Sequence, residues 1–138
     1  MTQQFDYLES RIRQNLEALS AKVESIEQPI TSRIGFSKND FFPLRAHLSF
    51  LRDRIGDEVV LSVDVKKYDG GFIIECEILK GEGQILAEMP SLNIEINAPT
   101  IATSSSMDRW VTSFEGFLIE NFDVLRSAVH SLGPNNAG

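Results

Sequence analysis

The sequence predicts an α+β fold in which a four-stranded antiparallel meander sheet carries helices on one face, in the order α-α-β-β-β-β-α. Apolar residues recur every three or four positions near both ends of the chain, which is the spacing of a helix. Between residues 57 and 97 they alternate with polar residues instead, which is the spacing of a half-buried strand. With 138 residues, the chain has the length of one domain, and we expect residues 1–138 to form it.

The first predicted helix covers residues 5–27. Its apolar positions follow steps of three and four, and nearly all other positions are polar. So narrow a stripe is closer to a coiled-coil contact than to the wider face of a domain helix. Two interpretations stay open: the helix lies along the edge of its own domain, or it pairs with a second copy through a dimer seam. The residues of that seam are Leu8, Ile12, Leu16, Leu19 and Val23.

Two further helices are predicted, at residues 40–55 and 108–132. The first has Pro43 in its opening turn, where proline is tolerated, and carries one apolar stripe. That stripe is formed by Leu44, Leu48, Leu51 and Ile55. The second follows a loop over residues 98–108 and has a broad apolar face, so we expect it to be well buried. Residues 133–138 are expected to form a tail.

Four strands are predicted within residues 57–97, joined by short turns. Asp69 and Gly70 mark a tight turn between the first two strands, and the segment 81–83 marks the next. Pro90 separates the third strand from the fourth. Because each strand alternates, the sheet should have one apolar face against the helices and one polar face.

Most of the net charge of −7 lies in the predicted sheet. Residues 57–97 hold nine acidic and three basic residues, a net charge of −6. Since side chains two apart on a strand share a face, these acids collect on the polar face. An acidic face with an aromatic residue suits protein binding, although a simply solvated face has the same pattern. The predicted partner-binding residues are Asp64, Tyr68, Glu75, Glu77, Glu88 and Glu95.

The acidic balance argues against binding to nucleic acid or to an anionic membrane, and it favours a basic protein as the partner. The N-terminus has neither the basic segment nor the apolar segment of a secretory signal. No apolar run approaches the 18 residues of a membrane-spanning helix. We therefore expect a cytoplasmic protein.

The sequence contains no recognisable motif for catalysis, metals or cofactors. His47 and His130 lie far apart, and Cys76 falls on the apolar side of its strand, so we expect no metal site, no cofactor and no catalytic residue. Arg45 and Arg52 are seven residues apart and should share one side of the second predicted helix. There they bind an anion or phosphate, stay solvated, or pair with neighbouring carboxylates.

These observations favour a non-enzymatic protein-binding module. Its acidic sheet face would neutralise or escort a basic protein, as an immunity protein or antitoxin masks a toxin. The alternative is a self-assembling adaptor or structural domain that dimerises through the seam on the first helix. A small-ligand binder or enzyme, which would use the space between sheet and helices, is a third hypothesis that no motif supports.

Overall fold

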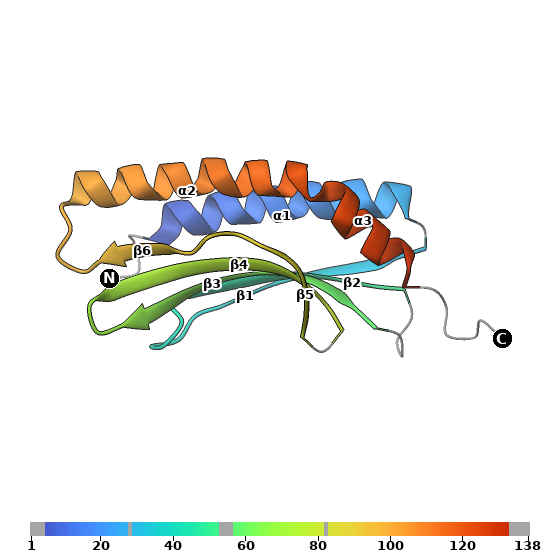
Figure 1. Cartoon of the computed structure of the whole chain (residues 1–138), viewed down its shortest axis with the longest axis horizontal. Coiled ribbons are helices and arrows are strands. Elements are labelled where there is room, and N and C mark those ends of the chain that lie inside the picture. Colours follow the sequence, from blue (N-terminus) through green and yellow to red (C-terminus); the bar gives the residue numbers. More distant parts are fainter. Residues whose placement is uncertain (1–4, 28, 53–56, 82, 133–138) are drawn as a thin grey trace.

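The computed structural model of the chain describes residues 5–27, 29–52, 57–81 and 83–132. Three helices lie on one side of an antiparallel sheet (Figure 1). The elements in chain order are α1 (Asp6–Ile26), β1 (Thr31–Ser37), β2 (Leu44–Leu51), β3 (Val59–Tyr68), β4 (Gly71–Lys80), β5 (Gln84–Glu88), β6 (Leu92–Glu95), α2 (Thr100–Glu120) and α3 (Phe122–His130). The predicted α+β class and the antiparallel sheet are confirmed, but the sheet has six strands rather than four.

Five strands pair in the order of the chain, β1-β2-β3-β4-β5, and every pair is antiparallel. The sixth strand corrects the predicted meander, because β6 pairs with β4 and not with β5. The two short strands share the same edge of β4: β6 covers its first half and β5 its second. The segment with Met89 and Pro90 crosses between them, held by a hydrogen bond from the Met89 amide to the Cys76 carbonyl.

The helix predicted at residues 40–55 is wrong, because this segment contains β2. A spacing of four residues suits both periods, so Leu44 and Leu48 fit a helix and a strand equally well. Ala46 and Phe50 decide between them, since both are buried with the two leucines while the residues between are more exposed. Strand β1 was also absent from the prediction. Residues 53–56, which include the predicted helix end, lie outside the described residues.

The predicted helices at the two ends of the chain are present, with one correction at the C-terminal side. Helix α1 agrees with the predicted range of 5–27. The C-terminal helix starts at Thr100, inside the segment predicted as a loop, and it breaks at Asn121 into α2 and α3. The Asn121 side chain donates to the Phe117 carbonyl and so occupies an acceptor at the end of α2. The predicted tail at 133–138 lies outside the described residues.

Helices α1 and α2 run side by side over the sheet and enclose the core with it (Figure 1). The five seam residues, Leu8, Ile12, Leu16, Leu19 and Val23, are all buried in this core. The structure therefore favours the first of the two interpretations of α1, in which the helix packs within its own chain. None of the described helices is long and apolar enough to cross a membrane.

Candidate functional site

The six predicted partner-binding residues all lie on the sheet face opposite the helices, which we call the outer face. Strand register shows that they share a face, because Asp64 is paired with Glu75 and Glu77 with Glu88. The residues that alternate with Asp64, Glu75 and Glu77 along β3 and β4 are buried in the core. Tyr68 and Glu95 are both paired with Gly71, one on each side of it. Paired residues in a sheet share a face, so the predicted alternation is correct for this group.

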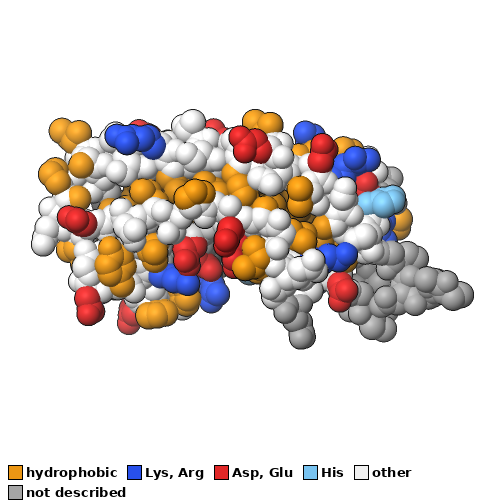
Figure 2. Space-filling view, viewed as in Figure 1, with side chains coloured by type: hydrophobic (Ala, Val, Ile, Leu, Met, Phe, Trp, Pro, Cys, Tyr) orange, Lys and Arg blue, Asp and Glu red, His pale blue; other side chains and the backbone are white. Residues whose placement is uncertain are grey.

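Two of the predicted acids are neutralised by neighbours on the outer face. The Asp64 carboxylate lies 3.0 Å from the Arg45 guanidinium, and the Glu75 carboxylate lies 2.6 Å from the Lys66 ammonium. The ion pair with Glu75 also raises the pKa of Lys66. Figure 2 shows acidic and basic side chains next to one another on the strand layer, below the helices. Asp64 and Glu75 therefore contribute little net negative charge to this face.

Glu77 and Glu88 form an acidic pair on the outer face. They stand opposite each other on β4 and β5, and in the described part of the chain no basic side chain lies within 4.0 Å of either carboxylate. Both line a hollow of about 640 Å³ beside the crossing segment between β5 and β6. Lys66 lines the same hollow and its charge acts on Glu77, but its ammonium group is ion-paired with Glu75. Like charges directly across a strand pair are destabilising, so this arrangement has a cost to the fold.

An apolar row borders the two glutamates on the outer face. Val60 is paired with Leu79, and Leu79 is paired with Ile85. A register shift in the β4–β5 pair turns Ile85 outward, where half of its surface is exposed, and Leu86 packs against the core instead. An exposed Tyr68 lies further along β3. The acidic hollow thus has apolar side chains beside it, as protein-binding surfaces commonly do.

The β1–β2 half of the outer face carries arginine side chains and no acidic residue, which the sequence prediction missed. Arg33, Arg45 and His47 occupy exposed positions of β1 and β2. The predicted helix at 40–55 put Arg45 and Arg52 on one side, but in a strand two residues seven positions apart lie on opposite faces. Arg45 therefore lies on the outer face, where it stacks on Phe42, while Arg52 reaches the helix side. The alternation of Leu44 to Phe50 was the signal for this.

Arg52 takes part in an ionic cluster around Glu27, which is buried at the end of α1. The Glu27 carboxylate lies 2.9 Å from His130 Nδ1, 3.3 Å from Arg126 Nε and 3.4 Å from Arg52 Nη2. The hydrogen bond with His130, and then the nearby arginines, lower the pKa of Glu27. Arg52 also donates to the carbonyls of Pro29 and Val129. We assign this cluster to holding α1, β2 and α3 together.

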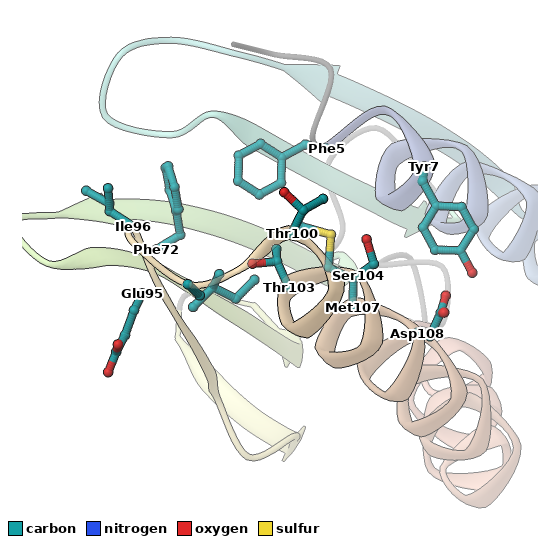
Figure 3. Close-up of a pocket in the computed structure, with 12 residues that line it drawn as sticks. Phe5, Tyr7, Phe72, Glu95, Ile96, Thr100, Thr103, Ser104, Met107 and Asp108 are labelled. Atoms are coloured by element: carbon teal, nitrogen blue, oxygen red, sulfur yellow. The ribbon is translucent and has the colours of Figure 1, made fainter.

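A separate cavity of about 590 Å³ lies where the starts of α1 and α2 meet β6 (Figure 3). Thr103 and Ser104 bring hydroxyl groups to it. Tyr7 and Asp108 point toward one another at its rim, and the Asp108 carboxylate raises the pKa of Tyr7. Glu95 also borders the cavity, but its carboxylate points away from it. The apolar wall is formed by Phe5, Phe72, Ile94, Ile96 and Met107.

The remaining candidate residues do not form a reactive centre. Cys76 is buried, and burial raises the pKa of its thiol well above the ordinary value, so the thiol stays protonated. His47 lies over Gly35 on the outer face, whereas His130 belongs to the cluster at Glu27. Within the described ranges, no three side chains of His, Cys, Asp or Glu gather as metal ligands would.

Comparison with known proteins gives no family for this chain. No protein-family model matches it, and neither a curated protein nor a solved structure matches it. The function must therefore be argued from the geometry of its own residues.

Proposed function

We propose that this chain is a non-enzymatic protein-binding module that neutralises or escorts a basic partner protein. The contact is the hollow at Glu77 and Glu88, together with the apolar row beside it. A lysine or arginine of the partner would lie between the two carboxylates. The contact covers less of the outer face than the sequence suggested, because the β1–β2 half carries arginines and no acidic residue.

The observation that carries this proposal is the pairing of two glutamates across β4 and β5, with no basic side chain of the described residues within 4.0 Å of either carboxylate. Within the chain this pair is destabilising, by roughly 0.2–1 kcal/mol on the scale of cross-strand pairs. A cation from a partner would turn the repulsion into two attractive contacts. The hollow of about 640 Å³ leaves space for such a side chain, and the exposed Ile85 offers apolar contact at its edge.

The test is affinity capture from lysate of the native host with the wild-type chain and with the double variant Glu77→Gln, Glu88→Gln. We expect the wild type to retain one basic protein in stoichiometric amount, and to lose it at high salt because the contact is between charges. The double variant should retain much less of it. Since the variant removes a repulsion, its melting temperature should stay the same or rise, which excludes unfolding as the cause.

A matched control carries Glu17→Gln and Glu120→Gln, two exposed glutamates on the helix side of the molecule. It has the same net charge as the double variant and should retain the partner like the wild type. Equal retention by all three proteins would contradict the assignment of the hollow. Equal loss in both double variants would mean that net charge alone, and not this surface, drives the association.

The cavity at the start of α2 favours a second candidate function, the binding of a small molecule with an apolar body and a polar group. Its apolar wall and hydroxyl groups have the composition of such sites. The test is titration of the labelled protein with hexanol and benzyl alcohol, followed by NMR. Saturable shifts at Thr103 and Met107 would support it, whereas no saturation up to the solubility limit of either alcohol would contradict it.

A further inference from the structure

The two edges of the sheet differ in how well they resist pairing with another strand. The edge beyond β4 is divided between β5 and β6, which have five and four residues, and Pro90 lies between them. Short strands, a register shift and proline are features that prevent edge-to-edge pairing. Strand β1 at the other edge has none of them, since it runs for seven residues without proline and pairs with β2 in continuous register.

Strand β1 also has outward main-chain groups and half-buried apolar side chains that suit pairing with another strand. In the described part of the chain no strand pairs with its outward side, so that side presents main-chain donors and acceptors. Its only charged residue is Arg33. Ile34 and Phe36 point to the helix side and stay only half-buried at the rim of the core. A strand added here would complete both the hydrogen bonds and the apolar layer.

We propose that β1 pairs with β1 of a second copy of this chain, antiparallel and centred on Ile34, so that the two sheets become one. This register pairs all seven residues of the strand. It places Ile34 opposite Ile34 of the second copy and Ser32 opposite Phe36 of the second copy. Residues of one face meet residues of the same face, as an antiparallel pair requires. A two-fold axis through Ile34 then makes both halves of the contact identical.

Charges on α1 favour this occupant over an unrelated strand. Along the rim, the Glu24 carboxylate accepts a hydrogen bond from Ser32, while the Arg13 guanidinium stacks on Phe36 at 4.0 Å. Because Ser32 meets Phe36 of the second copy, Glu24 of each copy comes to lie beside Arg13 of the other. Arg13 is paired with Glu9 of its own chain at 3.4 Å, but its side chain is still 46% exposed and can reach a second carboxylate. Symmetry gives two such pairs in each dimer.

The ends of the paired strands are complementary too. Continuing the same register by one residue past Ser37 brings Lys38 opposite Ile30 of the second copy. A shallow hollow of about 520 Å³ lies there, lined by Ile30, Pro29 and Glu24 among others. Lys38, whose side chain is 44% exposed and is paired with Glu9 in its own chain, approaches a second carboxylate at this point. The rim of each copy, formed by α1 and Lys38, therefore presents acids and bases in an order that matches the rim of the other copy.

The experiment is sedimentation equilibrium on the full chain and on three variants: Arg13→Glu, Glu24→Arg and the two changes together. We expect a reversible wild-type dimer. Each single reversal creates two like-charge pairs in the dimer and should raise its dissociation constant by about tenfold or more. The double variant restores both pairs with exchanged signs, so its dissociation constant should return toward the wild-type value.

Matched controls are Arg109→Glu and Glu120→Arg, which reverse the same charges at exposed positions of α2. These should leave the dissociation constant unchanged. The proposal is overturned by a wild-type chain that stays monomeric at every concentration. It is also overturned by a dimer that is indifferent to the reversals, or by one that the single reversals weaken without recovery in the double variant.

A cross-link gives a second, independent measurement of the register. With Ile34→Cys, the two new thiols face each other at the two-fold axis, and mild oxidation should give a covalent dimer linked through residue 34. The native Cys76 is buried, so the wild-type chain is the control and should remain uncross-linked. Oxidation of folded Ile34→Cys without covalent dimer, under conditions where the wild type sediments as a dimer, would refute the register.

Discussion

Replacing Leu16 by alanine tests whether the narrow stripe of α1 belongs to the core of its own chain. Leu16 is fully buried between α1 and the sheet. Removing its branched end leaves a cavity there, and substitutions of this kind in well-packed cores cost about 3 kcal/mol. For a chain of this size, the free energy of unfolding falls by about 1.5 kcal/mol per molar urea. The two values together predict that the urea midpoint falls by about 2 M.

The assay is urea unfolding at two chain concentrations that differ widely, followed by circular dichroism. A contact within the chain lowers the midpoint by the same amount at both concentrations. A contact in a dimer seam lowers it only where the dimer is populated. Glu17→Ala, at the next and exposed position of α1, is the control and should change the free energy of unfolding by no more than about 0.5 kcal/mol. A concentration-dependent loss for Leu16→Ala, or one no larger than the control, would refute the assignment of the stripe to the core.

Two further predictions concern glycine positions and pH. Gly71→Ala should strongly lower the melting temperature, because the new methyl carbon would lie 1.9 Å from the Ile94 carbonyl oxygen. In Gly116→Ala the new methyl carbon meets nothing within 4 Å in α2, so this variant should stabilise the fold by up to about 1 kcal/mol. Equal melting temperatures for the two variants would contradict this. The pKa of Glu27 is held below its ordinary value of 4.5, so its charge stabilises the fold above that pH, and this contribution is lost as the pH falls through the lowered pKa. Glu27→Gln should therefore be less stable than the wild type at pH 7 and lose less stability as the pH falls below 4.5. If the melting temperatures of both proteins fell in parallel below that pH, the charge of Glu27 would not have this stabilising role.

The sequence was most informative where one periodicity alone fitted the residues. The stripe from Leu8 to Val23 admits only a helix, and the alternation from Val59 to Val65 admits only a strand. Leu44 and Leu48 fit both, because a step of four is also two steps of two. Ala46 and Phe50, at the even positions around them, were the local signal for a strand, and the pairing of β2 with β1 and β3 fixes it.

For the candidate site, the sequence predicted the sheet face of the acidic residues but not their neighbours on adjacent strands. Alternation placed Glu75 and Glu77 on the outer face, and the strand register then brought Glu88 opposite Glu77. The ion pairs with Arg45 and Lys66 depend on which residues become cross-strand neighbours, and the sequence does not state the register. The outward position of Ile85 depends on the register shift in the β4–β5 pair, because a shift of one residue exchanges the two faces of a strand.

The ionic cluster at Glu27 has a consequence for the order in which the chain assembles. Strands β1 to β5 pair with their immediate successors, so the hairpins form from segments that leave the ribosome one after another. Helix α1 precedes all of them, yet the partners of its side chains come late in the chain. Arg11 of α1 pairs with Glu115, which is 104 residues away, and Glu27 pairs with His130, which is 103 residues away. The apolar side of α1 is therefore synthesised long before α2 and α3 arrive to enclose it. Protection of the Glu27 carboxylate from solvent would then mark the last step of folding, when α3 docks and the nascent chain no longer exposes its first helix.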